Sequence, residues 1–288
     1  MKMILVLLAA VLPLLLAGAP PLAAGDAAPP PSGPAPPSSG VPDYAAWNAL
    51  LARYYDPARG MDYRGLKTRD AGALADLRRR MAAVDVKPLA AKDQLAYWIN
   101  LYNISVVGIV VDHYPVKSIR DISTDPIIRL NVFKKPSVQV KGGATSLNDI
   151  ENVKIREGFK DLRIHFAINC AAASCPPIRP EAYVGARIDE QLDDQARKFL
   201  NDPRLGVKVD KDGETVVLHV TKILDWFAGD FEKWPLAGQG PGGSGETGRV
   251  AFVRKYLPPD KQQLIAGAKG KVKLDFYPYD WKLNDASR

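Results

Sequence analysis

The sequence predicts an α+β protein in which a mainly antiparallel sheet packs against one buried helix, at about residues 93–113. Three observations predict this class. Residues 92–115 are apolar almost all round, as a helix crossing the middle of a domain would be. Residues 138–147 and 206–220 have the pattern of strands joined by glycine turns. Helical and strand segments do not alternate regularly, which argues against a parallel α/β sheet.

The N-terminus has the layout of a secretory signal peptide. Lys2 supplies a positive charge, residues 4–16 are apolar, and small residues follow. Because this apolar run is too short for a stable membrane span, we expect residues 1–24 to be cleaved and the mature protein to be periplasmic or secreted. An uncleaved N-terminal anchor is the alternative. Residues 25–42 are rich in Pro, Ala, Ser and Gly, which predicts an extended linker.

The remaining residues, 43–288, suffice for a single globular domain. Ser146 precedes Asp149 by three residues, which indicates a capped helix that ends at Gly158. Residues 162–169 (LRIHFAIN) are apolar on both faces, which predicts a central strand. Other helices are predicted at 43–57, 71–84, 186–202, 222–228, 249–257 and 261–268, and a last strand begins at 271.

The charge pattern gives little information about partners. The formal net charge is +7, and lysines and arginines are interspersed with acids. No nucleic-acid motif is present, so no nucleic-acid partner is expected. The excess of basic residues is compatible with weak contact with anionic envelope polymers. The partner we expect is an envelope peptide or protein.

Both cysteines lie in the stretch HFAINCAAASCPP, residues 165–177. In an exported protein, two cysteines this close predict a disulfide between Cys170 and Cys175, which would contribute roughly 2 kcal/mol. The alternatives are a nucleophilic Cys170 with His165 as its base, a redox-active pair, or two unreactive thiols. The spacing does not match the C-x-x-C of thioredoxin-type centres. A fourth zinc ligand is not evident, so we predict no metal and no cofactor.

Asn100 and Asn103 lie three residues apart, on one face of the predicted central helix. A buried carboxamide left unpaired costs about 1–3 kcal/mol, so both need polar partners. We expect those partners on the face of the predicted strand that carries His165 and Asn169.

These residues define a candidate catalytic set. Cys170 would be the nucleophile and His165 the base, while Glu151, Asn100 or Asn103 would orient the imidazole or donate to an oxyanion. Side chains alternate along a strand, so contact between His165 and Cys170 requires the strand to end near residue 169 and the chain to turn back. A core histidine with a structural role is the alternative.

Six blocks of the sequence, in one order, carry a resemblance to a known family. They are GMDYRGLK (60–67), DQLAYWINLYN (93–103), DHYPVKSIRDI (112–122), SLNDIE (146–151), RIHFAINCAAASCPPIRPEAY (163–183) and KILDWFAGDF (222–231). Together these blocks resemble the domain-of-unknown-function family 547, over about residues 44–280. One departure is Asn152, where the family pattern has a histidine.

The resemblance implies export, as in many bacterial relatives, but no established reaction. Fusion of this domain to glutaredoxin-like modules in plants implies a redox context by association. The fold is expected to be similar to the papain and transglutaminase-like group, which is an analogy of fold and not of chemistry.

Taken together, the sequence favours an exported envelope protein that is a thiol-dependent hydrolase or transferase of peptide or amide bonds, or a degenerate relative of one. Two alternatives stay open. The first is a non-enzymatic binding or scaffold module with a Cys170–Cys175 disulfide. The second is an accessory factor in thiol–disulfide handling.

Overall fold

Helices and short strands are mixed along the chain, which confirms the α+β class. The structure is a computed structural model, and it describes residues 40–122, 131–232, 247–268 and 271–287. The predicted signal peptide lies outside these residues, as does the predicted linker before residue 40.

Helix α4 (Ala91–His113) is the predicted central helix. It ends before Tyr114 and Pro115, whose ring cannot continue a helix. Among the described helices, α4 has the length and composition of a membrane span, but 89% of its most apolar window is buried inside the protein. It is therefore a core helix.

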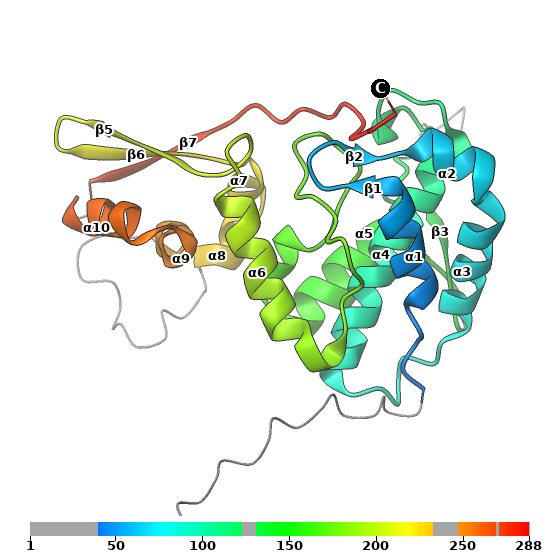
Figure 1. Cartoon of the computed structure of the whole chain (residues 1–288). Helices are drawn as coiled ribbons and strands as arrows, with labels where there is room; N and C mark the ends of the chain where they lie inside the picture. Colours follow the sequence, from blue (N-terminus) through cyan, green and yellow to red (C-terminus); the bar gives the residue numbers. More distant parts are fainter. Residues whose placement is uncertain (1–39, 123–130, 233–246, 269–270, 288) are drawn as a thin grey trace, which may run out of the picture. The chain divides into compact units, whose positions relative to one another are not determined.

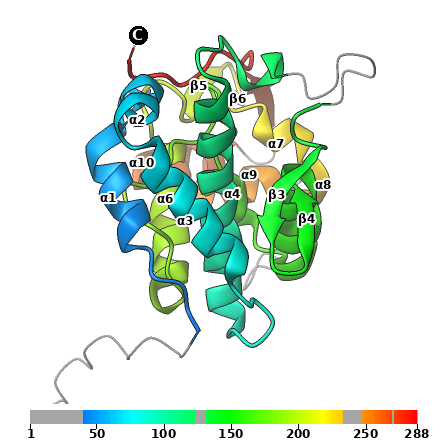
Figure 2. The same ribbon diagram turned by 90° about the vertical axis from the view of Figure 1, so that its right-hand side faces the viewer.

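Three helices in the first part of the chain pack around α4. They are α1 (Ala45–Tyr54), α2 (Tyr63–Arg69) and α3 (Ala71–Ala83), and a two-residue ladder of β1 (Tyr55–Asp56) and β2 (Gly60–Met61) separates the first two. Helices α2 and α3 contact α4 directly, and α1 packs against both of them. Figure 2 shows α1 on one side of α4 and the hairpin β3–β4 (Pro136–Val140 and Gly143–Ser146) on the other. Strand β3 contacts α3.

The hairpin β3–β4 and the helix after it follow their sequence signals. Gly142 and Gly143 both have positive φ, which a tight turn needs and glycine adopts without strain. Ser146 Oγ then accepts a hydrogen bond from the Asp149 backbone N–H at 3.0 Å, so it caps α5 (Leu147–Asp149) as predicted. The helix continues as a π-helical segment, η2 (Ile150–Glu157).

Residues 162–169 do not form the predicted strand. Leu162–Phe166 is a 3₁₀-helix, η3, whose first turn is capped because Asp161 Oδ1 accepts from the Arg163 backbone N–H at 2.9 Å. A short apolar run suits a buried helical turn as well as a buried strand, and here the acidic cap decides between the two.

The second part of the chain builds a three-stranded sheet with helices beside it. Strands β5 (Lys208–Asp212) and β6 (Thr215–Val220) form the second predicted hairpin, and β7 (Val272–Phe276) pairs parallel to β6. The helices are α6 (Ile188–Leu200), α7 (Ile223–Trp226), α8 (Ala228–Glu232), α9 (Gly248–Tyr256) and α10 (Pro259–Gly267). The described strands thus form three small sheets, where the sequence predicts one central sheet (Figure 1).

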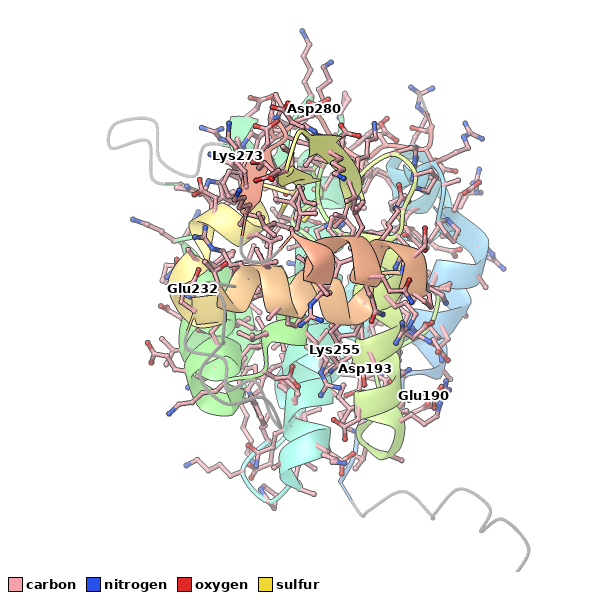
Figure 3. All side chains as sticks on the ribbon, turned by 90° about the vertical axis from the view of Figure 1, so that its left-hand side faces the viewer. Glu190, Asp193, Glu232, Lys255, Lys273 and Asp280 are labelled. Carbon is pink, nitrogen blue, oxygen red and sulfur yellow. The ribbon has the colours of Figure 1, made fainter. Side chains whose placement is uncertain are left out.

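Helices α6 and α9 are joined through Asp193, labelled in Figure 3 beside Lys255. The Tyr256 hydroxyl donates to Asp193 Oδ1 at 2.6 Å. The same two helices contribute Phe199 and Phe252 to an aromatic cluster. Phe166 packs on both rings, with centroids 5.6 and 5.7 Å apart.

The buried apolar residues form two clusters, and η3 lies between them. Ile164 and Ala167 belong to the cluster around α4. Phe166 belongs to the cluster formed by α6, α9 and the three-stranded sheet. His165 is therefore placed where the two hydrophobic clusters meet, and the candidate site lies at the same place.

Candidate functional site

A pocket of about 330 Å³ brings together most of the predicted site residues. His165, Cys170 and Glu151 line it, and so does Cys175. Aromatic side chains form part of its walls. Asn100 and Asn103 are not among the described residues that line this pocket.

The chain turns back directly after Asn169, which is the turn that contact between His165 and Cys170 requires. The hydrogen bonds described for the two side chains go to other residues: His165 bonds to Asp230, and Cys170 to Cys175 and Tyr279. Asn169 Oδ1 accepts from the Ala171 backbone N–H at 2.8 Å, and Ala171 itself has a φ of 62°. That left-handed conformation is uncommon for a residue with a Cβ and marks a sharp turn. The Cys175 N–H then donates to the Ala172 carbonyl at 3.0 Å, which returns the second cysteine to the first.

Cys170 and Cys175 are free thiols in this structure, so the predicted disulfide is absent from it. Their Sγ atoms are nevertheless 2.7 Å apart, in hydrogen-bond contact. Cys170 is half-buried and its Sγ lies 3.2 Å from the Tyr279 hydroxyl, whereas Cys175 is buried.

The two thiols differ in acidity. Burial raises the pKa of both. For Cys170, hydrogen bonds to Cys175, to Tyr279 and to the Ala172 backbone outweigh burial, and the pKa falls below its usual value. For Cys175, burial and the neighbouring Cys170 sulfur together place the pKa well above its usual value. Cys170 is therefore the more acidic of the two thiols.

His165 is held by a carboxylate that the sequence analysis did not choose. Its Nε2 lies 2.9 Å from Asp230 Oδ2, although Asp230 is 65 residues further along the chain. Arg156 donates two hydrogen bonds to the same carboxylate, from Nε and Nη2, both at 2.9 Å. The hydrogen bond from His165, together with Arg156, holds the pKa of Asp230 well below its usual range, so the carboxylate is ionised.

The ionised Asp230 fixes the tautomer of His165. A carboxylate only accepts hydrogen bonds, so Nε2 carries the proton and, in the neutral ring, Nδ1 carries the lone pair. Burial lowers the pKa of His165 in spite of the Asp230 carboxylate, so the neutral ring is favoured. The ring stacks on Phe227 with centroids 4.2 Å apart.

The Nδ1 atom of His165 is buried and has no hydrogen-bond partner among the described residues. The whole residue is only 3% exposed. Buried polar atoms are nearly always paired, because an unpaired one loses its hydration without compensation. Because His165 lines the pocket, a basic nitrogen on this ring without a partner among the described residues is a candidate for function.

The two asparagines of α4 pair with backbone. Asn103 Nδ2 donates to the Ala167 carbonyl at 3.0 Å, and its Oδ1 accepts from the Asn169 N–H at 2.9 Å. Asn100 makes the same pair of bonds with the backbone of Tyr183, at 2.7 and 2.9 Å. The Asn103 side chain therefore contacts the predicted segment 162–169, but it bonds to the backbone of that segment and not to the side chains of His165 or Asn169. Both asparagines hold loops in place.

Glu151 lies in the pocket without orienting His165. The Tyr102 hydroxyl donates to Glu151 Oε2 at 3.2 Å, and burial raises the pKa of the Glu151 carboxyl. Its neighbour Asn152 accepts from Arg156. Asn152 thus steadies the arginine that holds Asp230.

Sequence reasoning did not assign Asp230, Arg156 or Tyr279 to the site. Asp230 lies in the block KILDWFAGDF, where an acid between aromatic residues was the available signal. Among the described residues, no group of three or more His, Cys, Asp or Glu side chains is arranged to hold a metal ion.

The fold and the site define an α+β protein with a thiol, an imidazole and a carboxylate gathered at one pocket. Residues 86–200 match the model of a family described as protein of unknown function, DUF547. The matched residues lie within the segment, about 44–280, over which the sequence blocks resemble this family. The matched segment contains Glu151, His165 and both cysteines, and it ends before Asp230 and Tyr279. Comparisons with curated proteins and with solved structures gave no match.

Proposed function

We propose that the pocket is the active site of a thiol enzyme that hydrolyses or transfers acyl groups at peptide-like amide bonds. Cys170 is the nucleophile, His165 the general base and acid, and Asp230 the residue that orients the imidazole. The observation that carries the proposal is His165, whose Nε2 is fixed by Asp230 while its buried Nδ1 has no described partner. His165 and Cys170 both line the pocket.

The reaction follows from the lone pair on Nδ1. This nitrogen takes the Cys170 thiol proton, and the thiolate attacks the amide carbonyl carbon of the substrate. The imidazolium that forms is stabilised by Asp230, which Arg156 keeps ionised. The same proton then passes from Nδ1 to the departing amine, which leaves a thioester on Cys170. Water, or an acceptor amine in a transferase, attacks the thioester with Nδ1 as base, and the thiolate is released.

Tyr279 supports the proposal as a hydrogen-bond donor beside the nucleophile. Its hydroxyl lies 3.2 Å from Cys170 Sγ. Burial raises its pKa far above the usual value, so the phenol stays protonated. A neutral phenol at this position can donate to the carbonyl oxygen as negative charge develops on it.

The pocket walls suit a reaction shielded from water. Phe133, Phe227, Trp226 and Trp281 contribute apolar surface. A volume of about 330 Å³ is at the small end of the range for ligand sites, so it holds one or two residues of a peptide.

We also propose that the enzyme is exported and acts in the cell envelope. The support is the N-terminal pattern of Lys2, an apolar run at 4–16 and small residues after it. N-terminal sequencing of the secreted or periplasmic protein tests this, since export predicts a new N-terminus near residue 25, and full-length protein in the cytoplasm overturns it.

The enzyme proposal is tested with an activated acyl donor, p-nitrophenyl acetate, and intact mass. We expect a transient acetyl adduct on wild-type protein, absent from Cys170→Ser and retained in the matched variant Cys175→Ser. His165→Gln should slow adduct formation by about 100-fold or more, the typical contribution of a general base. Equal labelling of both single-cysteine variants, or no effect of His165→Gln, overturns the proposal.

A further inference from the structure

We propose that Cys170 and Cys175 form a reactive dithiol that exchanges with low-molecular-weight disulfides, with Cys170 as the attacking sulfur and Cys175 as the resolving sulfur. This redox reaction goes beyond acyl transfer and uses Cys175, which the mechanism above leaves without a role. It differs from the structural disulfide expected from the sequence, because the reduced pair is the state that the structure shows.

The geometry of the turn places the two sulfurs for exchange. Their Sγ atoms are 2.7 Å apart, and the Cys170 backbone N–H also donates to Cys175 Sγ, at 2.9 Å. The second contact ties the Cys175 side chain to the backbone of its partner. A resolving thiol held this close needs little chain movement to attack, so a mixed disulfide on Cys170 is short-lived.

The surroundings of the two sulfurs divide the roles between them. Cys170 is half-buried, lines the pocket and contacts the Tyr279 hydroxyl. Cys175 is 7% exposed. A disulfide that enters the pocket meets Cys170 as the more accessible and more thiolate-like sulfur. The small volume of the pocket selects low-molecular-weight disulfides over folded protein substrates.

The exchange balances with the disulfide as the named oxidant. The Cys170 thiolate attacks one sulfur of the disulfide R–S–S–R, forming Cys170–S–S–R and releasing one thiolate, which takes up a proton. The Cys175 thiol loses its proton and attacks Cys170 Sγ, forming the Cys170–Cys175 bond and releasing the second thiol. In total, two protein thiols are oxidised and one disulfide is reduced to two thiols.

The exchange itself does not require that the pocket carry out acyl transfer. The effect of the exchange on acyl transfer does rest on the proposed function, since a Cys170 engaged in a disulfide has no thiolate for acylation. Oxidation would then switch the enzyme off and reduction would restore it.

The test is to mix the reduced full-length protein with 2-hydroxyethyl disulfide and to measure intact mass and released thiol. Wild-type protein should lose two hydrogens in mass, keep no adduct and release two thiols per chain. Cys175→Ser should stop at a stable adduct on Cys170 and release one thiol. Cys170→Ser should react at least tenfold more slowly, because the buried Cys175 is left alone.

Three outcomes overturn the proposal. They are a stable adduct on wild-type protein, equal reactivity of the two single-cysteine variants, and failure of reduced wild-type protein to react. Thermal unfolding of each variant shows whether it is folded, and Tyr279→Phe is a further probe that keeps both sulfurs. Loss of the Tyr279 hydroxyl should slow the first step without changing the stoichiometry. Exchange that proceeds while p-nitrophenyl acetate leaves no adduct would overturn only the acyl-transfer proposal.

Discussion

Two regions of the molecule bury polar side chains to the same extent and use them differently. In the cluster around α4, Asn100 and Asn103 are each 1% exposed, and both ends of each carboxamide are bonded to backbone. At the junction with the second cluster, His165 is 3% exposed and only one of its two ring nitrogens has a described partner. A fully paired buried group holds the fold together, whereas a half-paired group in a pocket wall is available for chemistry.

Removing a paired side chain should have the largest effect on stability. Asn103→Ala leaves the Ala167 carbonyl and the Asn169 N–H unpaired, at about 1–3 kcal/mol for each group. We expect a loss of roughly 3 kcal/mol in the free energy of unfolding, measured by urea denaturation. The exposed Val153→Ala is the control and should change it by less than about 0.5 kcal/mol. A cost below about 1 kcal/mol for Asn103→Ala would remove the contrast between the regions.

Removing the orienting carboxylate should affect reactivity more than the fold. Asp230→Asn keeps the size of the side chain but ends the preference for a proton on Nε2 and weakens the grip of Arg156. We expect acetylation of Cys170 by p-nitrophenyl acetate to slow by about 100-fold, with the circular dichroism spectrum unchanged. Glu151→Gln is the matched pocket control, and the same loss in that variant would mean that Asp230 has no particular role.

Acid should destabilise the protein through the same dyad. Burial places the folded-state pKa of His165 below its ordinary value of 6.5, so the unfolded chain binds this proton first as pH falls. The resulting stability is present above about pH 6.5 and is lost as pH falls toward the folded-state pKa. Asp230, whose folded-state pKa is also depressed, adds a second loss below about pH 4.

Thermal unfolding between about pH 7.5 and pH 5 checks this prediction. The midpoint should decrease in wild-type protein and decrease less in His165→Gln, which has no imidazole to protonate. A midpoint that rises on acidification, or an identical slope in the two proteins, would show that His165 is not buried as a neutral ring.

An exposed ion pair should matter least. Lys255 Nζ lies 4.0 Å from Asp193 Oδ1, and both side chains are nearly half exposed (Figure 3). Lys255→Ala should change the free energy of unfolding by no more than about 0.5 kcal/mol, measured by urea denaturation. A larger loss would mean that the packing of α9 on α6 depends on this lysine, and the second cluster would then resemble the first.

Local signals predicted much of the fold. The predicted helix at 92–115 is Ala91–His113, and both glycine hairpins are present. The segment 162–169 was wrongly predicted as a strand, because apolarity on both faces also suits a buried 3₁₀ turn. The sequence also predicted one central sheet, whereas the described strands form three small ones. This error could not be avoided, because pairing between distant strands leaves no local pattern in the sequence.

Local signals also indicated part of the candidate site, and they missed the part that depends on distant contacts. Cys170, His165 and Glu151 lie in adjacent blocks of the sequence, and the structure places all three in one pocket. Asp230 reaches His165 through tertiary packing over 65 residues, so no spacing rule indicates it. The roles of Asn100 and Asn103 depend on backbone partners, which a sequence pattern does not specify.

The central claim is that His165 presents an unprotonated Nδ1 to the pocket that holds Cys170. Nitrogen-15 NMR of the histidine rings at about pH 7 tests it directly, with His165 assigned by comparison with His165→Gln. We predict a neutral ring with the proton on Nε2, and a shift of the Nδ1 resonance when Cys170 is alkylated with iodoacetamide. A proton on Nδ1, a cationic ring, or a resonance that does not respond to alkylation of Cys170 would contradict the claim.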